Sequence, residues 1–89
     1  MSHILAKLKG VNLQDIKKIL KMDEQKHAQQ GLKLQRLWQN VDNPNEVLFL
    51  FYSDDLNRAR QFIAKEHKQA LEENPNANLP EMIFMEESL

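Results

Sequence analysis

The pair of residues best suited to chemistry is an acid and an imidazole four positions apart. Asp23 and His27 fall in the same angular sector as the apolar residues of a helix predicted over 12–31, so both are expected to turn toward its buried side. At this spacing the carboxylate can orient the imidazole as a general base, or the two can share a metal. We predict Asp23 and His27 as catalytic residues, with a plain ion pair as the alternative. No third ligand is identified, so no metal site is predicted.

Three residues of the expected strands are candidates for binding a ligand. Arg36 and Trp38 alternate along one strand, so that a guanidinium and an indole share a face and could stack on or anchor an anionic group. Tyr52 carries a phenol that could donate a hydrogen bond in the interior. We predict Trp38, Arg36 and Tyr52 as ligand-binding residues. The alternatives are an edge-strand arginine whose guanidinium extends into solvent, and aromatic side chains that pack in the core or in the dimer interface.

A second acid and histidine, Glu66 and His67, flank the apolar stripe of the second predicted helix. Because two helices on one sheet face are expected to run antiparallel, we expect this pair to lie away from Asp23 and His27. A joint site of all four is therefore not predicted. His3 opens the first strand and is expected to lie at a solvated chain end.

The elements that must position these residues follow from hydrophobic period and capping. Asn12 and the Asp54-Asp55 pair are N-cap types, and Gly31 suits a left-handed helix end. Leu32, Leu34 and Trp38 are expected to face one way along their strand. The predicted elements are strands over 3–9, 32–41, 46–53 and 79–86, helices over 12–31 and 55–74, and a hairpin turn over 42–45.

This order, βαββαβ, predicts a single α+β domain over 1–89 with a ferredoxin-like fold. Four antiparallel strands then carry two helices on one face, and the other face is left bare. The strands over 46–53 and 79–86 are apolar on both sides, which predicts an exposed apolar sheet face. The simplest partner for such a face is a second copy of the chain, so we predict a homodimer.

The composition excludes several classes of function. The 89 residues include no cysteine, so disulfides and thiolate sites are absent. Twelve Lys and Arg oppose 13 Asp and Glu, for a net charge of -1, and this balance argues against a nucleic-acid partner. No long apolar run or signal-like start is present, so we expect no membrane partner and a cytoplasmic location.

The motifs over 38–47, 54–63 and 79–84 resemble those of small uncharacterised prokaryotic proteins of the dimeric α/β-barrel superfamily, and the resemblance spans about residues 36–86. These motifs are turns, caps and strand entries. The resemblance implies the ferredoxin-like fold and a homodimer. Its relatives include cofactor-free monooxygenases, haem-degrading enzymes, small isomerases and dehydratases, so the fold does not select a reaction. The asparagine, tryptophan and histidine set of the haem-degrading relatives is not matched, and no cofactor is predicted.

Three functional hypotheses remain open at this stage. The first is a homodimer that binds or transforms a small apolar molecule in a pocket of each protomer. The second is a non-catalytic structural or regulatory homodimer. The third is an RNA-binding domain of the same element order, disfavoured because Asn45-Glu46-Val47-Leu48 stands where RNA-recognition domains carry a basic residue and a glycine.

Overall fold

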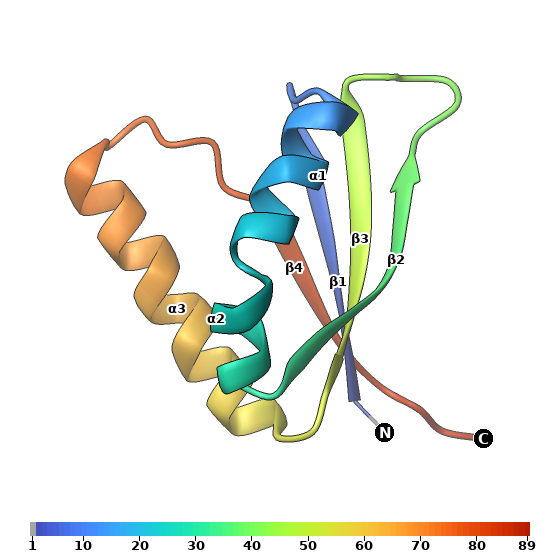
Figure 1. Ribbon diagram of the computed structural model, residues 1–89, viewed down its shortest axis with the longest axis vertical. Coiled ribbons are helices and arrows are strands. Elements are labelled where there is room, and N and C mark those ends of the chain that lie inside the picture. Colours follow the sequence, from blue (N-terminus) through green and yellow to red (C-terminus); the bar gives the residue numbers. More distant parts are fainter. Residues whose placement is uncertain (1) are drawn as a thin grey trace.

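The computed structural model describes residues 2–89 and contains one sheet covered by helices on one side (Figure 1). The four strands pair antiparallel in the order β2-β3-β1-β4. The predicted α+β, ferredoxin-like βαββαβ layout is confirmed, with one predicted helix divided into two. The elements are β1 (Ser2–Lys9), α1 (Leu13–Met22), α2 (Glu24–Gln29), β2 (Leu32–Gln39), β3 (Glu46–Ser53), α3 (Leu56–Glu73) and β4 (Glu81–Glu86).

The two predicted helix starts are confirmed by their caps. The Asn12 side chain accepts hydrogen bonds from the backbone N–H groups of Gln14 (2.8 Å) and Asp15 (3.4 Å), which satisfies donors that the first turn leaves free. Asp55 does the same at the start of α3, where its carboxylate accepts from the Arg58 N–H at 3.1 Å. Both helices therefore begin where the sequence places an Asx residue before an apolar stripe.

The prediction of one continuous helix over 12–31 is wrong at Asp23. There the backbone adopts φ -93° and ψ 5°, and Asp23 ends α1 and begins α2. Its N–H donates to the Ile19 carbonyl at 3.0 Å and its own carbonyl accepts from the His27 N–H at 2.9 Å, so the chain bends with its backbone hydrogen bonds kept. An acidic N-cap type followed by Glu24 was the sequence signal for a second helix start.

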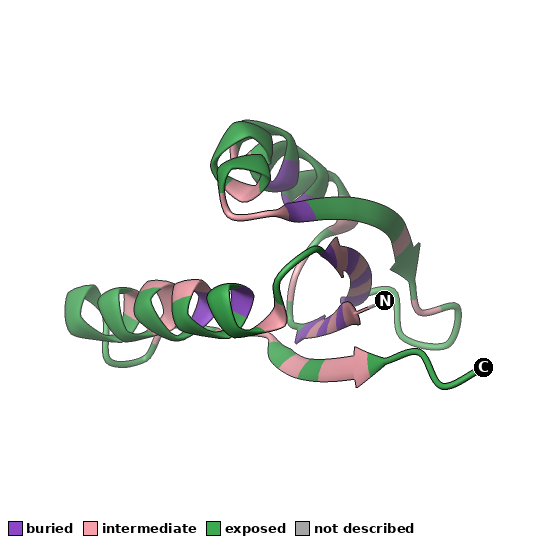
Figure 2. Cartoon of the chain, turned by 90° about the horizontal axis from the view of Figure 1, so that it is seen from below, coloured by how far each residue is buried: buried purple, intermediate pink, exposed green. Residues whose placement is uncertain are grey.

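The two central strands, β1 and β3, show which sheet face meets the helices. Their buried residues alternate with half-exposed ones along each strand (Figure 2). The buried positions pair across the strands, so they lie on one face, and they join the core with residues of α1 and α3. These sheet core residues are Ile4, Ala6 and Leu8 on β1 and Val47, Phe49 and Phe51 on β3.

The other sheet face, here called the open face, carries apolar side chains that no helix covers. Leu5, Leu50 and Ile83 lie in register across three strands of this face. Two of its members are large and well exposed, Trp38 at 45% and Ile83 at 37%. The apolar residues of the open face are Leu5, Trp38, Leu48, Leu50, Tyr52, Ile83 and Met85.

A register shift in β2 overturns the predicted facing of Trp38. Leu34 pairs with Phe51, but Arg36 pairs with Leu50, so Gln35 is an extra residue in the ladder. Leu34 therefore faces the helices, whereas Trp38 lies on the open face opposite Leu48. The irregular spacing of apolar residues, from Leu34 to Leu37, was the sequence signal for this change of phase.

Two strand boundaries differ from the prediction by two residues each. β2 ends at Gln39, and Val41 is 92% exposed in the hairpin instead of extending the strand. The turn is closed by hydrogen bonds from the Asn40 N–H to the Glu46 carbonyl and from the Glu46 N–H to the Asn43 carbonyl, both 2.9 Å. β4 begins at Glu81, two residues later than predicted. Within residues 2–89 we find no helix long and apolar enough to cross a membrane.

Candidate functional site

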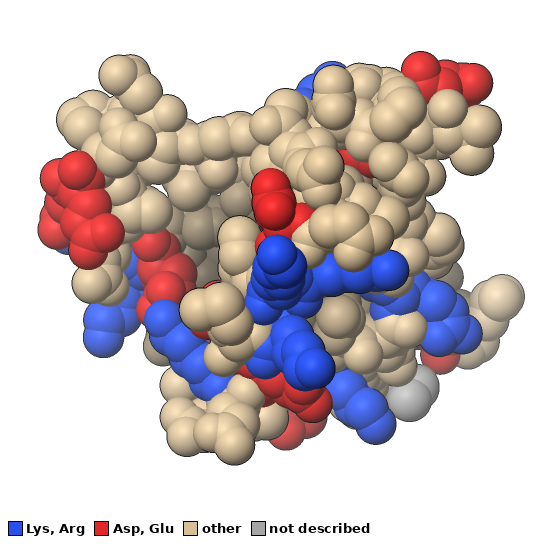
Figure 3. Space-filling model, turned by 45° about the horizontal axis from the view of Figure 1, so that its top comes forward, with Lys and Arg blue, Asp and Glu red and all other residues tan. Residues whose placement is uncertain are grey.

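The bend at Asp23 leaves a space between the α1–α2 segment and α3. This interhelical cleft has a volume of about 250 Å³. Leu8, Phe49 and Met82 of the sheet form its floor. Figure 3 shows a hollow in the surface between the α1–α2 segment and α3. A cleft with an apolar sheet floor and helical walls can hold a small apolar molecule.

Asp23, His27, Glu66 and His67 all line this interhelical cleft, which overturns the expectation that the two acid–histidine pairs lie apart. Two contacts join α2 to α3: an ion pair from Lys26 Nζ to Glu66 Oε2 at 2.9 Å, and a hydrogen bond from the Arg58 guanidinium to the Gln29 carbonyl. The helices meet along α2, because the bend redirects it toward α3, whereas α1 and the C-terminal end of α3 diverge (Figure 1). Within residues 2–89 the acids and histidines form no cluster suited to a metal ion.

His27 lies half-buried between two phenylalanine rings. Its ring meets Phe51 of β3 edge-on at a centroid distance of 5.0 Å and Phe62 of α3 at 6.3 Å. Burial is the main cause that lowers the pKa of His27 below 6.5, and Lys26 adds to this, whereas Asp23 and Glu66 oppose it. The imidazole is therefore neutral near pH 7 and can accept a proton from a bound molecule.

His67 has a similar environment on α3. Burial lowers its pKa below 6.5, and the neighbouring Glu66 acts in the opposite direction. The cleft thus holds two neutral imidazoles near pH 7, one on each helical wall. Both histidines could be identified from the sequence. That they share a cavity depends on the angle between the helices, and no local sequence pattern indicates this angle.

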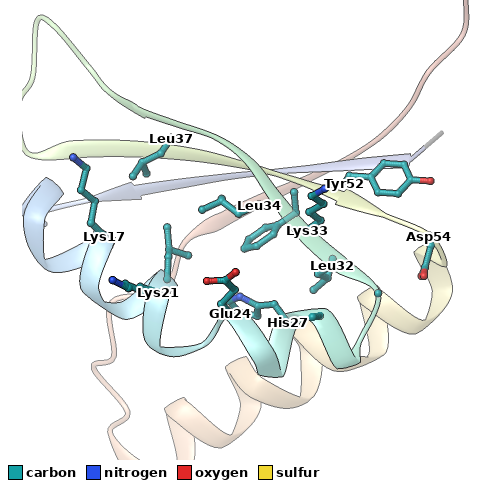
Figure 4. Close-up of a pocket in the computed structure, with 14 residues that line it drawn as sticks. Lys17, Lys21, Glu24, His27, Leu32, Lys33, Leu34, Leu37, Tyr52 and Asp54 are labelled. Carbon is teal, nitrogen blue, oxygen red and sulfur yellow. The ribbon is translucent and has the colours of Figure 1, made fainter.

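A second space, here called the β2 cleft, lies between the α1–α2 segment and the edge strand β2. Its volume is about 690 Å³, and Figure 4 shows its lining side chains. Leu20, His27, Leu32 and Phe51 line both clefts, so these residues separate the two spaces. His27 is the only histidine that borders both of them in the part of the chain described.

The predicted ligand-binding residues lie apart from His27. Arg36 and Trp38 are on the open face and line neither cleft, and the Arg36 guanidinium donates to the Gln35 carbonyl at 2.8 Å. Tyr52 borders the β2 cleft, but its ring meets His3 edge-on at 5.8 Å. Figure 4 shows this ring pointing away from the middle of the cleft. The structure brings Asp23 and His27 together in the interhelical cleft. The sheet separates them from Arg36 and Trp38, and Tyr52 stays at the border of the β2 cleft.

The lowered pKa of His27 is open to direct measurement by proton–carbon NMR titration of the imidazole. We expect a midpoint below 6.5, and a still lower one in Asp23→Asn, because the aspartate charge stabilises the imidazolium. Asp15→Asn, which removes an exposed acid from the first turn of α1, is the control and should leave the midpoint unchanged. A midpoint above 6.5 would contradict the buried, neutral imidazole.

The same shift predicts the direction of the pH dependence of folding. Because the pKa of His27 is lower in the folded chain than in the unfolded one, the unfolded chain binds more protons between the two values. The stability linked to His27 is present above pH 6.5 and is lost as the pH falls through the folded-state pKa. Urea unfolding at a series of pH values should show this loss, and it should be smaller in His27→Gln.

Comparisons with known proteins bear on the fold. No model of a known protein family and no curated protein matches the chain. A crystal structure named as a "putative antibiotic biosynthesis monooxygenase" from Deinococcus radiodurans superposes with a TM-score of 0.65 at 17% identity, covering 100% of this chain and 94% of that one. A second, named as an antibiotic biosynthesis monooxygenase, gives 0.58 at 18% identity with 100% of both chains covered. At such identity the likeness concerns the fold alone, and it supports the ferredoxin-like α+β layout of this chain.

Proposed function

We propose that the chain forms a homodimer in which each protomer binds a small apolar molecule in the interhelical cleft. The observation that carries this proposal is the half-buried His27, held between Phe51 and Phe62 in a cavity with an apolar floor. An imidazole kept neutral in such surroundings is suited to remove a proton from a bound ligand. His27 is proposed as the general base, and Asp23 as the acid that favours the imidazolium formed by the transfer.

The reaction proposed for this chain is a single proton transfer, and it is not taken from the names of the similar structures. Those names describe monooxygenases, and they apply to those proteins. For this chain the proposed step is removal of a proton from an acidic O–H or C–H of the ligand. The proton moves to an imidazole nitrogen of His27, and the ligand is left as its anion. The Asp23 charge stabilises the resulting imidazolium.

The dimer is proposed from the open face. Seven apolar residues lie on this face, which no helix of the chain covers. Charged residues on the two edge strands border it, Arg36 on β2 and Glu81 on β4, and Glu81 pairs with Lys7 of β1 at 3.8 Å. An uncovered apolar face bordered by charged residues is typical of an interface, and the resemblance of the sequence to dimeric α/β-barrel proteins implies a homodimer.

The binding proposal is tested with the neutral dye N-phenyl-1-naphthylamine, whose fluorescence rises in apolar surroundings. Ile19 lines the interhelical cleft and is 51% exposed, so Ile19→Glu places a carboxylate at the cleft without disturbing the core. We expect this change to weaken dye binding by about tenfold or more, because an apolar contact becomes a charged one.

The matched control is Leu71→Glu on α3. Leu71 is 43% exposed and lines none of the cavities described above, so the control makes the same chemical change at similar exposure. It should leave dye binding unchanged. Equal loss in both variants, or no binding by the unmodified protein, would contradict the ligand proposal and favour a non-catalytic structural or regulatory homodimer.

A further inference from the structure

The β2 cleft is a second cavity, which the proposed function does not use. It lies on the far side of the α1–α2 segment from the interhelical cleft and opens toward the edge strand β2. Its volume, about 690 Å³, lies within the range of sites for small organic ligands. The β2 bulge at Gln35 shapes it, because the change of phase turns both Leu34 and Leu37 toward α1.

The floor of the β2 cleft is apolar. Leu34 is 39% exposed although it lies on the helix side of the sheet, so the helices leave it uncovered. Leu37 lies beside it toward the α1 end of the cleft (Figure 4). Buried Leu20, Leu32 and Phe51 continue this surface inward. Filling the cleft with an apolar body would remove this leucine surface from water.

One end of the β2 cleft is basic. Lys17 and Lys21 stand one helical turn apart on α1, and Figure 4 shows both at the same end of the cleft. Neither forms an ion pair with any residue of 2–89, in contrast to Lys26, which is bound to Glu66. The acidic residue Asp54 lies at the opposite end (Figure 4).

The distribution of charge in the β2 cleft favours one orientation of a bound ligand. The charge of the basic end is free for an anion, and Glu24 and Asp54 disfavour an anionic group in the remainder of the cleft. Lys33 also lines the cleft, on the side of Tyr52, so the basic end is distinguished by its two neighbouring lysines (Figure 4). From the paired lysines, the leucine floor and the volume, we infer that the β2 cleft binds an apolar monocarboxylate. Its carboxylate lies between the Lys17 and Lys21 ammonium groups, and its hydrocarbon body lies over Leu34 and Leu37.

The test compares two probes that share one ring system, 2-naphthoate and the neutral 2-naphthalenemethanol. Binding is measured by calorimetry at low salt, and the site is located by backbone amide shifts. We expect the carboxylate to bind about tenfold or more tightly than the alcohol, since hydrogen bonds to charged groups are stronger than neutral ones. The largest shifts should fall on Lys17, Leu34 and Leu37.

Charge removal supplies the matched variants. Lys17→Gln combined with Lys21→Gln should reduce naphthoate affinity to the level of the alcohol and leave the affinity of the alcohol unchanged. Lys18→Gln combined with Lys68→Gln removes the same charge from two exposed positions that line neither cleft, and it should change neither affinity. Equal affinity for both probes, or equal losses in both double variants, would overturn the inference.

A further variant separates this inference from the proposed function. Ile19 lines the interhelical cleft and not the β2 cleft, so Ile19→Glu should retain naphthoate binding even where it abolishes dye binding. Naphthoate shifts centred on Ile63, His67 and Met82, with binding lost in Ile19→Glu, would place the carboxylate in the interhelical cleft and overturn the inference.

Discussion

Leu50→Lys is expected to convert the proposed homodimer into monomers. Leu50 lies on the open face of the central strand β3, in register with Leu5 of β1 and Arg36 of β2. In a face-to-face dimer its side chain is buried by the partner, and an ammonium group there has no acid beside it among its register neighbours. The cost of burying it is several kcal/mol, so we expect the dimer dissociation constant to rise by about a thousandfold or more.

The measurement is native mass spectrometry combined with light scattering across a range of concentrations. Leu71→Lys, which adds the same charge at an exposed position of α3, should keep the dimer. The combination of Asp23→Ala and His27→Ala should keep it too, because these residues lie on the helix side of the sheet. Circular dichroism of Leu50→Lys should show a folded monomer. A dimer of unchanged affinity would disprove the face-to-face arrangement.

Gly31→Ala should lower the free energy of unfolding by about 2–4 kcal/mol through two separate effects. Gly31 joins α2 to β2 with φ +72°, a conformation that costs other residues about 1–2 kcal/mol. An added Cβ would also lie 1.9 Å from Asp54 Oδ1, so the Asp54 side chain would have to move. The backbone there is held by a hydrogen bond from the Asp54 N–H to the Gly31 carbonyl at 3.2 Å.

A double-mutant cycle with Asp54→Ala separates the two effects. Removing the Asp54 carboxylate relieves the steric conflict and leaves the backbone strain, so Gly31→Ala should cost about 1–2 kcal/mol in that background. Urea unfolding of the four proteins provides the values. If the cost is the same in both backgrounds, the contact between Gly31 and Asp54 contributes nothing. Gly10→Ala is the control, with φ +72° and no atom closer than 3.8 Å.

Much of the fold could be predicted because its signals are local. The caps at Asn12 and Asp55 each involve residues two or three positions apart, and the alternation in β1 and β3 has a period of two. The predicted facing failed in β2, where one extra residue, Gln35, reverses the phase of every residue after it. The prediction of one helix over 12–31 was wrong at Asp23. The chain can turn there because both backbone hydrogen bonds of Asp23 are kept.

The sequence could predict which residues belong to the candidate site, but not which of them share a cavity. Spacing alone put Asp23 and His27 on one side of a helix, and both do line the interhelical cleft. The presence of Glu66 and His67 in the same cavity depends on the angle between two helices that meet at the Lys26–Glu66 ion pair, 40 positions apart. Arg36 and Trp38 share a face as their alternation predicted, but that face is the open one.

The sequence by itself determined the element order, both main helix starts and the apolar strands that leave one sheet face uncovered. The tertiary structure decided which strand faces are buried, how α1–α2 and α3 diverge, and hence which residues share a cavity. The physical reason lies in the range of the interactions. Caps and periods depend on neighbouring residues, whereas a cavity depends on packing among segments far apart in the chain, such as Phe51 and Phe62 around His27.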